Sequence, residues 1–262
     1  MKNICVLPAF AFLLVFFVIP VVLLLSYSFL DRDYLGDVYY RLSSDAWYHS
    51  VDSVSLKVIR RTVIVSVSVT ILCLLIGYPV ACIANSFRKV TSELLLGIFV
   101  FPLITSSLLK TYGWIGVLPS SWKGNIFVVV FVMTSTYLPF MILSIIKSLE
   151  RIDINLIDAS MDLGANKYHT LVFVTLPLSL NGILSGCLLV FIPSAGEYLV
   201  PHFIGEGKVN VVATLILQQF MERRNWPYAA SMTVWLITIL LIPFAVINIA
   251  IHVWSKNKTS EE

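Results

Sequence analysis

The chain has 262 residues, of which 58% are hydrophobic and 13% are charged, and its formal net charge is +3. Soluble domains average roughly 45–50% apolar and about 25% charged residues, so a soluble fold of this length would need more polar surface than this chain supplies. The composition excludes a soluble enzyme, a disordered protein and a nucleic-acid-binding protein, and it indicates a membrane protein.

Long uncharged runs divide the chain into six predicted membrane-spanning helices. A helix needs about 20 mostly apolar residues to cross a bilayer core of about 30 Å. The runs are too long and too continuously apolar for the alternating strands of a membrane barrel. The sequence therefore predicts an all-α, polytopic fold. The predicted spans are residues 5–30, 62–87, 94–115, 124–146, 168–196 and 225–255, with Lys110 interrupting the third.

The segment between the first two predicted spans, residues 31–57, is rich in aspartate and aromatic residues. Aromatic side chains gather at membrane interfaces. The segment fits either a docking surface for an extramembrane partner or an ordinary solvated loop.

The orientation of the spans does not follow from charge. Six spans place both termini on the same side of the membrane. The basic residues are divided almost evenly between the two sets of connecting segments. The tendency of basic residues to stay in the cytoplasm therefore does not decide which set is cytoplasmic.

Catalytic and ligand-binding motifs are missing from the sequence. The cysteines all fall in apolar spans and the histidines are scattered, without the spacing of a metal site. No H-E-x-x-H, G-x-S-x-G or G-x-x-x-x-G-K-[ST] pattern occurs. The sequence therefore predicts no catalytic residue, no metal site and no bound cofactor.

Between the fourth and fifth predicted spans lies a polar segment with the signals of a short helix. Asn155 can cap its start, with Asp158 at the position of a capping-box acid. The spacing of Leu156, Ala159 and Leu163 places these residues on one face, and Gly164 stands where a helix ends in the left-handed conformation. A helix this short is unstable alone in water, so it must pack on something. A second helical run is predicted to start near Asn166 and to enter the bilayer through Leu176 and Pro177.

This segment resembles the EAA loop of ABC importer permeases. The pattern Asp158-Ala159-Ser160-x3-Gly164-x9-Val174-x-Leu176-Pro177 matches that loop, with Asp158, Ser160 and Val174 as mild departures. The stretches Gly77–Ala81, Gly186–Pro193 with Gly196–Tyr198, and Asn225–Pro227 resemble the polyamine permeases. The resemblance is strongest to the first permease subunit of spermidine/putrescine importers, although the connection between spans three and four is shorter than in that subunit.

The resemblance implies a type I ABC importer permease fold and a mechanism. The loop 155–177 would be cytoplasmic and would couple the spans to a separate ATPase through Asp158, Ala159, Ser160, Gly164, Leu176 and Pro177. Both termini would then be cytoplasmic, in a multi-pass protein of the bacterial inner membrane. The implied partners are a second permease, an ABC ATPase dimer that uses the ATP, and an external substrate-binding protein.

The predicted organisation has three parts. Residues 1–54 form the first span and an external loop, and residues 55–252 form the permease core with the coupling loop 147–176. Residues 253–262 form a cytoplasmic tail.

The favoured cargo is a polyamine, which is a long cation and needs carboxylates and aromatic faces along its route. Glu197 is the acid at the edge of a long apolar run, and an ionisable residue there is a candidate for the path. It fits an outer interface position equally well. The aromatic candidates are Tyr198, Tyr112, Trp114 and Trp226.

Three other functions compete with this interpretation. One is an ABC permease for another small substrate, such as an organic cation, iron or a phosphonate. Another is a secondary transporter that works without an ATPase, which usually carries inverted repeats and charged residues in mid-span. The third is a polytopic membrane enzyme, which the missing catalytic cluster disfavours.

Overall fold

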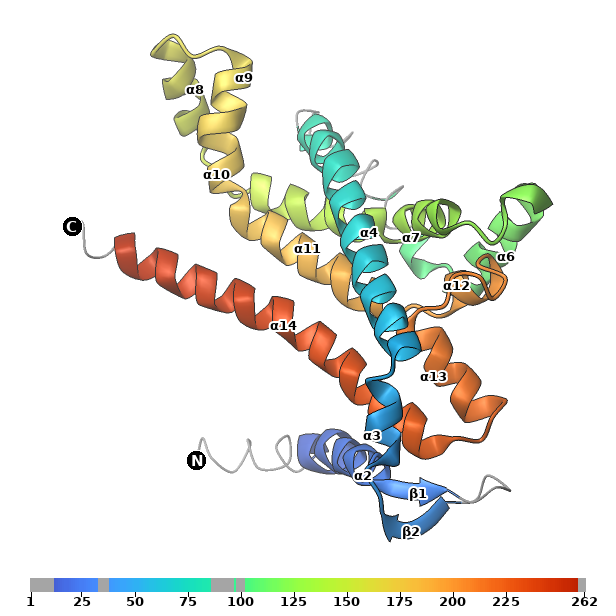
Figure 1. Cartoon of the computed structure of the whole chain (residues 1–262). Coiled ribbons are helices and arrows are strands. Elements are labelled where there is room, and N and C mark those ends of the chain that lie inside the picture. The colour runs from blue at the N-terminus through green and yellow to red at the C-terminus, as the bar shows by residue number, and fades with distance from the viewer. Residues whose placement is uncertain (1–11, 33–37, 86–96, 98–101, 259–262) are drawn as a thin grey trace. The chain divides into compact units, whose positions relative to one another are not determined.

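The computed structural model describes residues 12–32, 38–85, 97 and 102–258, and the described chain is mostly helical (Figure 1). The chain forms two compact units. The first comprises residues 1–62 and 210–239, and the second comprises residues 63–209 and 240–262. Helices α4 (Ser53–Asn85) and α14 (Trp226–Lys258) each begin in the first unit and continue in the second.

The first unit contains a short β-hairpin after an apolar helix. Asp31 lies opposite Tyr39 in this antiparallel pair. The all-α prediction is wrong for this segment, because a β-branched residue and two tyrosines at the start of the second strand favour extended backbone. The elements are the π-helical turn η1 (Leu14–Val18), α2 (Ile19–Tyr27), β1 (Leu30–Arg32), β2 (Val38–Leu42), α3 (Asp45–Ser50) and α13 (Val212–Met221), with the first parts of α4 and α14.

Buried hydroxyl groups connect the helices of the first unit. The Ser55 and Tyr228 hydroxyls share a hydrogen bond of 2.6 Å between α4 and α14. The Thr62 hydroxyl oxygen accepts a bond of 2.8 Å from the backbone N–H of Val212, at the start of α13. Within the segment 31–57, which the sequence leaves as either a docking surface or a loop, the described residues form paired strands followed by α3 and the start of α4.

The second unit has its apolar core around α7 (Ile126–Leu149), which lies beside α11 (Leu180–Ala195). Val129, Met133, Met141 and Ile142 of this helix are fully buried, and α7 packs along α11. Asn125 caps α7 by accepting a hydrogen bond of 2.9 Å from Phe127 N–H. The other elements are α6 (Ser107–Val117), the 3-10 turn η2 (Ser120–Trp122), α8 (Ile154–Asp162), α9 (Lys167–Thr170), the π-helical turn η3 (Leu171–Thr175), α10 (Leu176–Leu178) and α12 (Leu199–Phe203).

Within the described residues, three helices are long and apolar enough to cross a membrane: α4, α7 and the Trp226–Pro243 part of α14. They correspond to the second, fourth and sixth predicted spans. The fifth predicted span is a bent pair, in which Lys167–Leu178 and Leu180–Ala195 meet at 66°. The first and third predicted spans fall partly outside the described residues, and their described parts form shorter helices.

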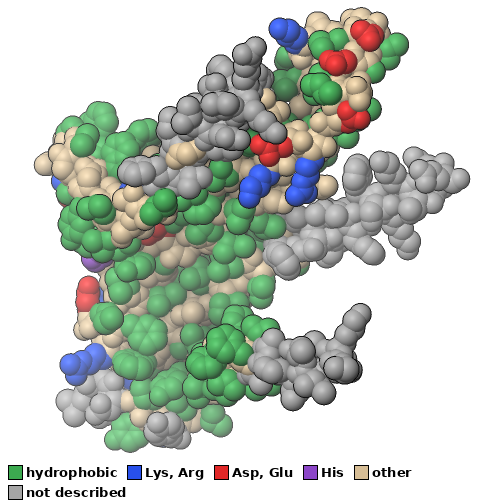
Figure 2. Space-filling view, turned by 180° about the vertical axis from the view of Figure 1, so that it is seen from behind, with side chains coloured by type: hydrophobic (Ala, Val, Ile, Leu, Met, Phe, Trp, Pro, Cys, Tyr) green, Lys and Arg blue, Asp and Glu red, His purple; other side chains and the backbone are tan. Residues whose placement is uncertain are grey.

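The outer face of these helices is apolar. On α4, Ile71 and Leu75 are 51% and 65% exposed, as expected for side chains that meet lipid. Hydrophobic side chains dominate the face visible in Figure 2, whereas acidic side chains gather around α8. The polar end of the second unit is therefore the α8–α9 hairpin.

Two glycines set the close approach of α7 and α11. A Cβ at Gly182 would overlap the Cβ of Ser148, and a Cβ at Gly186 would lie 2.7 Å from Met141 Sδ. The four-residue spacing of these glycines therefore serves helix contact, as small residues do between membrane helices.

Candidate functional site

The start of α8 is fixed by an aspartate. Asp153 Oδ1 accepts hydrogen bonds from the Asn155 backbone N–H (3.0 Å) and from the Asn155 side-chain amide (2.9 Å). The predicted cap at Asn155 is therefore displaced by two residues. Asparagine and aspartate both cap helices well. Asp153 lies two residues earlier, and its carboxylate accepts the hydrogen bond from the backbone N–H of Asn155. Asp158 consequently lies in the middle of α8 and not in a capping box.

The end of α8 is a Schellman motif centred on Gly164. The N–H of Gly164 donates to Met161 C=O (2.9 Å) and the N–H of Ala165 donates to Ser160 C=O (3.1 Å). Gly164 has a φ of +87°, a conformation that residues with a Cβ adopt at a cost. A Cβ here would meet no atom within 4 Å. The glycine is thus required by the backbone, as the sequence predicts, and not by packing against the described residues.

The hairpin is closed by contacts between α8 and α9. Asn166 caps α9 by accepting a hydrogen bond of 2.8 Å from His169 N–H, which places the second helical run where the sequence predicts it. The hydroxyls of Ser160 and Thr170 share a hydrogen bond of 2.9 Å, and Thr170 is buried. Ser160 therefore faces α9 and holds the two helices together.

The opposite face of α8 is exposed. Leu156 is 50% exposed and Leu163 is 90% exposed. Ala159, Asp158 and Asp162 are exposed as well. Apolar side chains that stand out from a polar hairpin are typical of an interaction surface. Of the predicted coupling residues on α8, Asp158 and Ala159 are therefore exposed, whereas Ser160 faces α9.

The hairpin continues into a break in the fifth span. Pro177 has no N–H group, and the π-helical turn η3 precedes it, a combination that is typical of a bend. The bend falls at Ser179, whose hydroxyl shares a hydrogen bond of 3.2 Å with the Tyr78 hydroxyl of α4. The Ser179 carbonyl also accepts a bond of 3.5 Å from the Ser148 hydroxyl of α7. Sequence reasoning missed Ser179, which nothing in its neighbourhood distinguishes from other serines.

Glu197 lies in a buried position between α11 and α12. It is 7% exposed. The Tyr137 hydroxyl donates to Oε2 (2.6 Å) and the Leu199 backbone N–H donates to Oε1 (2.8 Å). Lys110 of α6 also interacts electrostatically with this carboxylate. Sequence reasoning missed Tyr137, although a tyrosine inside a long apolar span needs a partner for its hydroxyl.

The structure brings only some of the predicted aromatic residues near Glu197. Tyr198 follows it directly and is 41% exposed. Tyr112 of α6 is half-exposed and packs on Phe203 of α12, with ring centroids 5.3 Å apart. Trp114 packs on Phe131. Trp226 belongs to the first unit, where it contacts Tyr27 and Phe220.

Among the described residues, no group of three or more His, Cys, Asp or Glu side chains is arranged to hold a metal ion. In the second unit, the predicted site residues described above lie chiefly in two places, the α8–α9 hairpin and the surroundings of the buried Glu197.

Solved structures with the same fold are transport proteins. The chain aligns with a bacterial ABC transporter involved in the import of the acidic polysaccharide alginate, at a TM-score of 0.66 and 15% identity over 94% of each chain. It also aligns with a bacterial alginate ABC transporter in complex with an alginate pentasaccharide-bound periplasmic protein, at a TM-score of 0.68 and 14% identity over 92% of each chain. At these identities the likeness describes the fold alone.

Relatives of known function are permeases. The chain is 31% identical over 259 residues to the spermidine/putrescine transport system permease protein PotB of Haemophilus influenzae, covering 92% of this chain and 91% of that protein. It is 28% identical to the protein of the same name from Escherichia coli, over 87% of this chain and 90% of that protein. It is also 27% identical to the inner membrane ABC transporter permease protein YdcU of Escherichia coli, with 71% and 68% covered.

The family match covers most of the chain and includes both the α8–α9 hairpin and Glu197. Residues 73–260 match the family of the binding-protein-dependent transport system inner membrane component. The chain therefore belongs to this family of inner-membrane proteins and is a permease subunit of an ABC importer.

Proposed function

We propose that this permease carries a polyamine across the bacterial inner membrane and is driven by a separate ABC ATPase dimer that docks on α8. The observation that carries the proposal is the exposed face of α8, with Leu156, Ala159 and Leu163 outward and with the ends of the helix fixed by Asp153 and Gly164. The PotB relatives, which are named for spermidine and putrescine, support the cargo.

The proposed topology has six spans with both termini in the cytoplasm. It follows from assigning α8 to the cytoplasmic side, where an ATPase has access to it. The described helices supply spans two, four and six and the bent fifth span. The first and third spans would be completed by the segments around α2 and α6.

The proposed assembly contains a second permease, two ATPase subunits and an external substrate-binding protein. This chain would bind no cofactor, and ATP would be used by the ATPase. The family description, which is that of a binding-protein-dependent system, supports the external receptor.

The coupling step follows from the connection between α8 and the bend. Closure of the ATPase dimer would move the α8–α9 hairpin, which is held together by the Ser160–Thr170 hydrogen bond. The movement would reach Pro177 and the bend at Ser179, which contacts α4 through Tyr78. Two arrangements of this bend would correspond to inward-open and outward-open states. The ATPase shifts the balance between them by binding one state more tightly.

The substrate path is proposed to pass the α6–α12 region. A polyamine carries ammonium groups, which are attracted to carboxylates and to aromatic faces. Glu197 supplies negative charge from a buried position, and the exposed rings of Tyr112 and Tyr198 supply faces. Trp114 lies on the same helix as Tyr112, and Trp226 remains a candidate in the first unit.

Reconstitution tests the proposal. The permease pair is placed in vesicles with and without its ATPase, and uptake of labelled spermidine is measured in the presence of ATP and the binding protein. We expect uptake only when the ATPase and ATP are both present. Uptake by the permease alone would indicate a secondary transporter. ATP-dependent uptake of iron, a phosphonate or another organic cation, with no uptake of spermidine, would assign a different cargo.

A further inference from the structure

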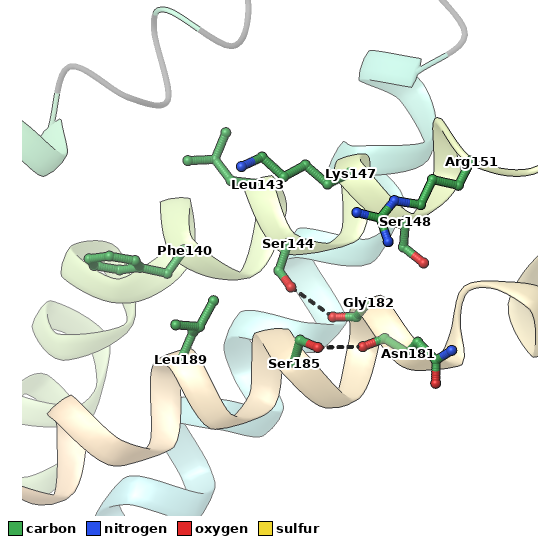
Figure 3. A pocket seen from close by; sticks show the side chains of 10 residues that line it. All are labelled: Phe140, Leu143, Ser144, Lys147, Ser148, Arg151, Asn181, Gly182, Ser185 and Leu189. Atoms are coloured by element: carbon green, nitrogen blue, oxygen red, sulfur yellow. Dashed lines mark hydrogen bonds between the residues drawn. The ribbon is translucent and has the colours of Figure 1, made fainter. Parts of the chain in front are cut away.

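A cavity of about 380 Å³ opens between adjacent ends of α7 and α11 (Figure 3). It lies at the base of the α8–α9 hairpin, because Arg151, one of its lining residues, is two residues before the Asp153 cap. The cavity is separate from Glu197, which is not among its lining residues. The proposed transport function does not use it.

The hydrophilic end of the cavity is cationic. Lys147, in the last turn of α7, and Arg151, which follows that helix, both line it and are exposed. In the part of the chain that the structure describes, no acidic side chain lines the cavity. Two positive charges so placed repel a polyamine, so this cavity suits an anion and not the proposed cargo.

The hydrogen-bond donors of the cavity agree with its charge. The Ser144 hydroxyl donates to Gly182 C=O (2.9 Å) and the Ser185 hydroxyl donates to Asn181 C=O (2.7 Å), as the dashed lines in Figure 3 show. These protons are already in use. The Ser148 hydroxyl, which also lines the cavity, donates to Ser179 C=O (3.5 Å). Among the described lining residues, the side-chain donors that remain for a ligand are the Lys147 ammonium, the Arg151 guanidinium and the Asn181 amide. A phosphate group is a suitable acceptor for all three.

The other end of the cavity is apolar. Leu143 and Phe140 lie one and two turns before Lys147 on α7, and Leu189 on α11 is 51% exposed. The lining therefore changes from cationic to apolar over about 10 Å along the helices. A phospholipid changes along its length in a matching way, from an anionic phosphate to apolar acyl chains.

We propose that this cavity binds the headgroup of an anionic phospholipid at the membrane surface on which α8 lies. Lys147 and Arg151 pair with the phosphate, and the acyl chains run along Phe140, Leu143 and Leu189. Basic pockets between membrane helices are known to bind such headgroups. The assignment to the cytoplasmic leaflet rests on the proposed function. The bound lipid stabilises the ends of α7 and α11, between which the coupling hairpin is inserted.

Native mass spectrometry of the purified permease complex tests this site. The complex is incubated with dioleoyl phosphatidylglycerol or dioleoyl phosphatidylcholine, and the retained lipid is measured. The test variant carries Lys147→Gln and Arg151→Gln. The control variant carries Lys57→Gln and Arg60→Gln, which remove the same charge from exposed positions at the start of α4. Each basic residue near an anionic lipid is worth about fivefold in binding, so we expect the test variant to bind phosphatidylglycerol about 25-fold more weakly.

The control variant should retain phosphatidylglycerol as the unmodified complex does, and phosphatidylcholine should be retained poorly by all three. Equal retention of phosphatidylglycerol by the test and control variants would overturn the proposal. So would displacement of the lipid by soluble glycerol phosphate at an equal concentration, which would indicate a site for free phosphate. A photoreactive residue at Ser185 should crosslink to lipid. Crosslinking to another protein subunit would instead assign the cavity to a protein interface. Because these measurements record lipid binding, their failure is distinguishable from a failure of transport.

Discussion

The Tyr137 hydroxyl of α7 donates a hydrogen bond of 2.6 Å to the buried carboxylate of Glu197, which lies 60 residues later in the chain. This bond joins the middle of α7 to the connection between α11 and α12. It also makes Glu197 part of the packed second unit, so the carboxylate combines a structural role with its proposed role in attracting cargo.

Removing the tyrosine hydroxyl should weaken the structure. Tyr137→Phe leaves a buried carboxylate with one donor fewer, and hydrogen bonds to charged groups contribute about 1.5–3 kcal/mol. We expect a lower thermal-unfolding temperature for the purified permease complex, measured by tryptophan fluorescence.

Glu197→Gln tests the negative charge of this side chain separately from its hydrogen bonds. Glutamine keeps an acceptor oxygen but no negative charge, so we expect a raised KM for spermidine uptake with a smaller loss of stability than in Tyr137→Phe. A wild-type KM in Glu197→Gln would remove this residue from the substrate path and leave it a structural role.

The turn after α8 should tolerate asparagine better than valine. Gly164 has a φ of +87°, and the space that a side chain would occupy there is open. Asparagine adopts this conformation more readily than a β-branched residue does. We therefore expect Gly164→Val to reduce uptake and ATPase stimulation strongly and Gly164→Asn to retain much of both. Equal loss in the two variants, with normal membrane insertion, would show that a partner approaches too closely for any side chain.

The exposed apolar residues of α8 should matter for ATPase binding and not for folding. Leu163→Asp changes a side chain that is 90% exposed, and Leu42→Asp in β2 changes one that is 84% exposed. We expect the Leu163 variant to lose co-purification of the ATPase and the Leu42 variant to keep it. Normal ATPase recovery with Leu163→Asp would argue against α8 as the docking helix.

The contact between α7 and α11 should not accept a methyl group at Gly182. A Cβ there would overlap Ser148, so Gly182→Ala should destabilise the permease by about 1–3 kcal/mol through overpacking. Gly116→Ala in α6 is the matched control, because a Cβ there meets no atom within 4 Å and alanine favours helices. The thermal-unfolding temperature should fall for Gly182→Ala alone. A similar fall in both would indicate a general effect of the substitution.

The sequence alone predicts the features that depend on local chemistry. Uncharged runs predict the long helices α4, α7 and α14, because charge is costly within a bilayer. Gly164 is predicted as a helix end because few residues adopt its backbone conformation. The motif around it also predicts the permease family, which the match over residues 73–260 confirms.

Features that depend on partners distant in the sequence could not be predicted in this way. The Tyr137–Glu197 bond and the Tyr78–Ser179 bond join residues 60 and 101 positions apart. Asp153 and Asn155 both have the right chemistry for a cap, so the sequence does not reveal that α8 begins after Asp153. The β-hairpin at Leu30–Leu42 is not evident from the sequence because its polar and aromatic residues also suit an interfacial loop.

Crosslinking from Ala159 directly tests whether the ATPase docks on α8 at the cytoplasmic side of the membrane. A single cysteine is introduced as Ala159→Cys, and the assembled importer carries a second cysteine on the surface of its ATPase. We expect a permease–ATPase crosslink that changes in yield when ATP is added. We also expect a membrane-impermeant thiol reagent to reach the cysteine only from the cytoplasmic side. Labelling only from outside the cell, or transport at the normal rate with no crosslink at any ATPase position, would contradict it.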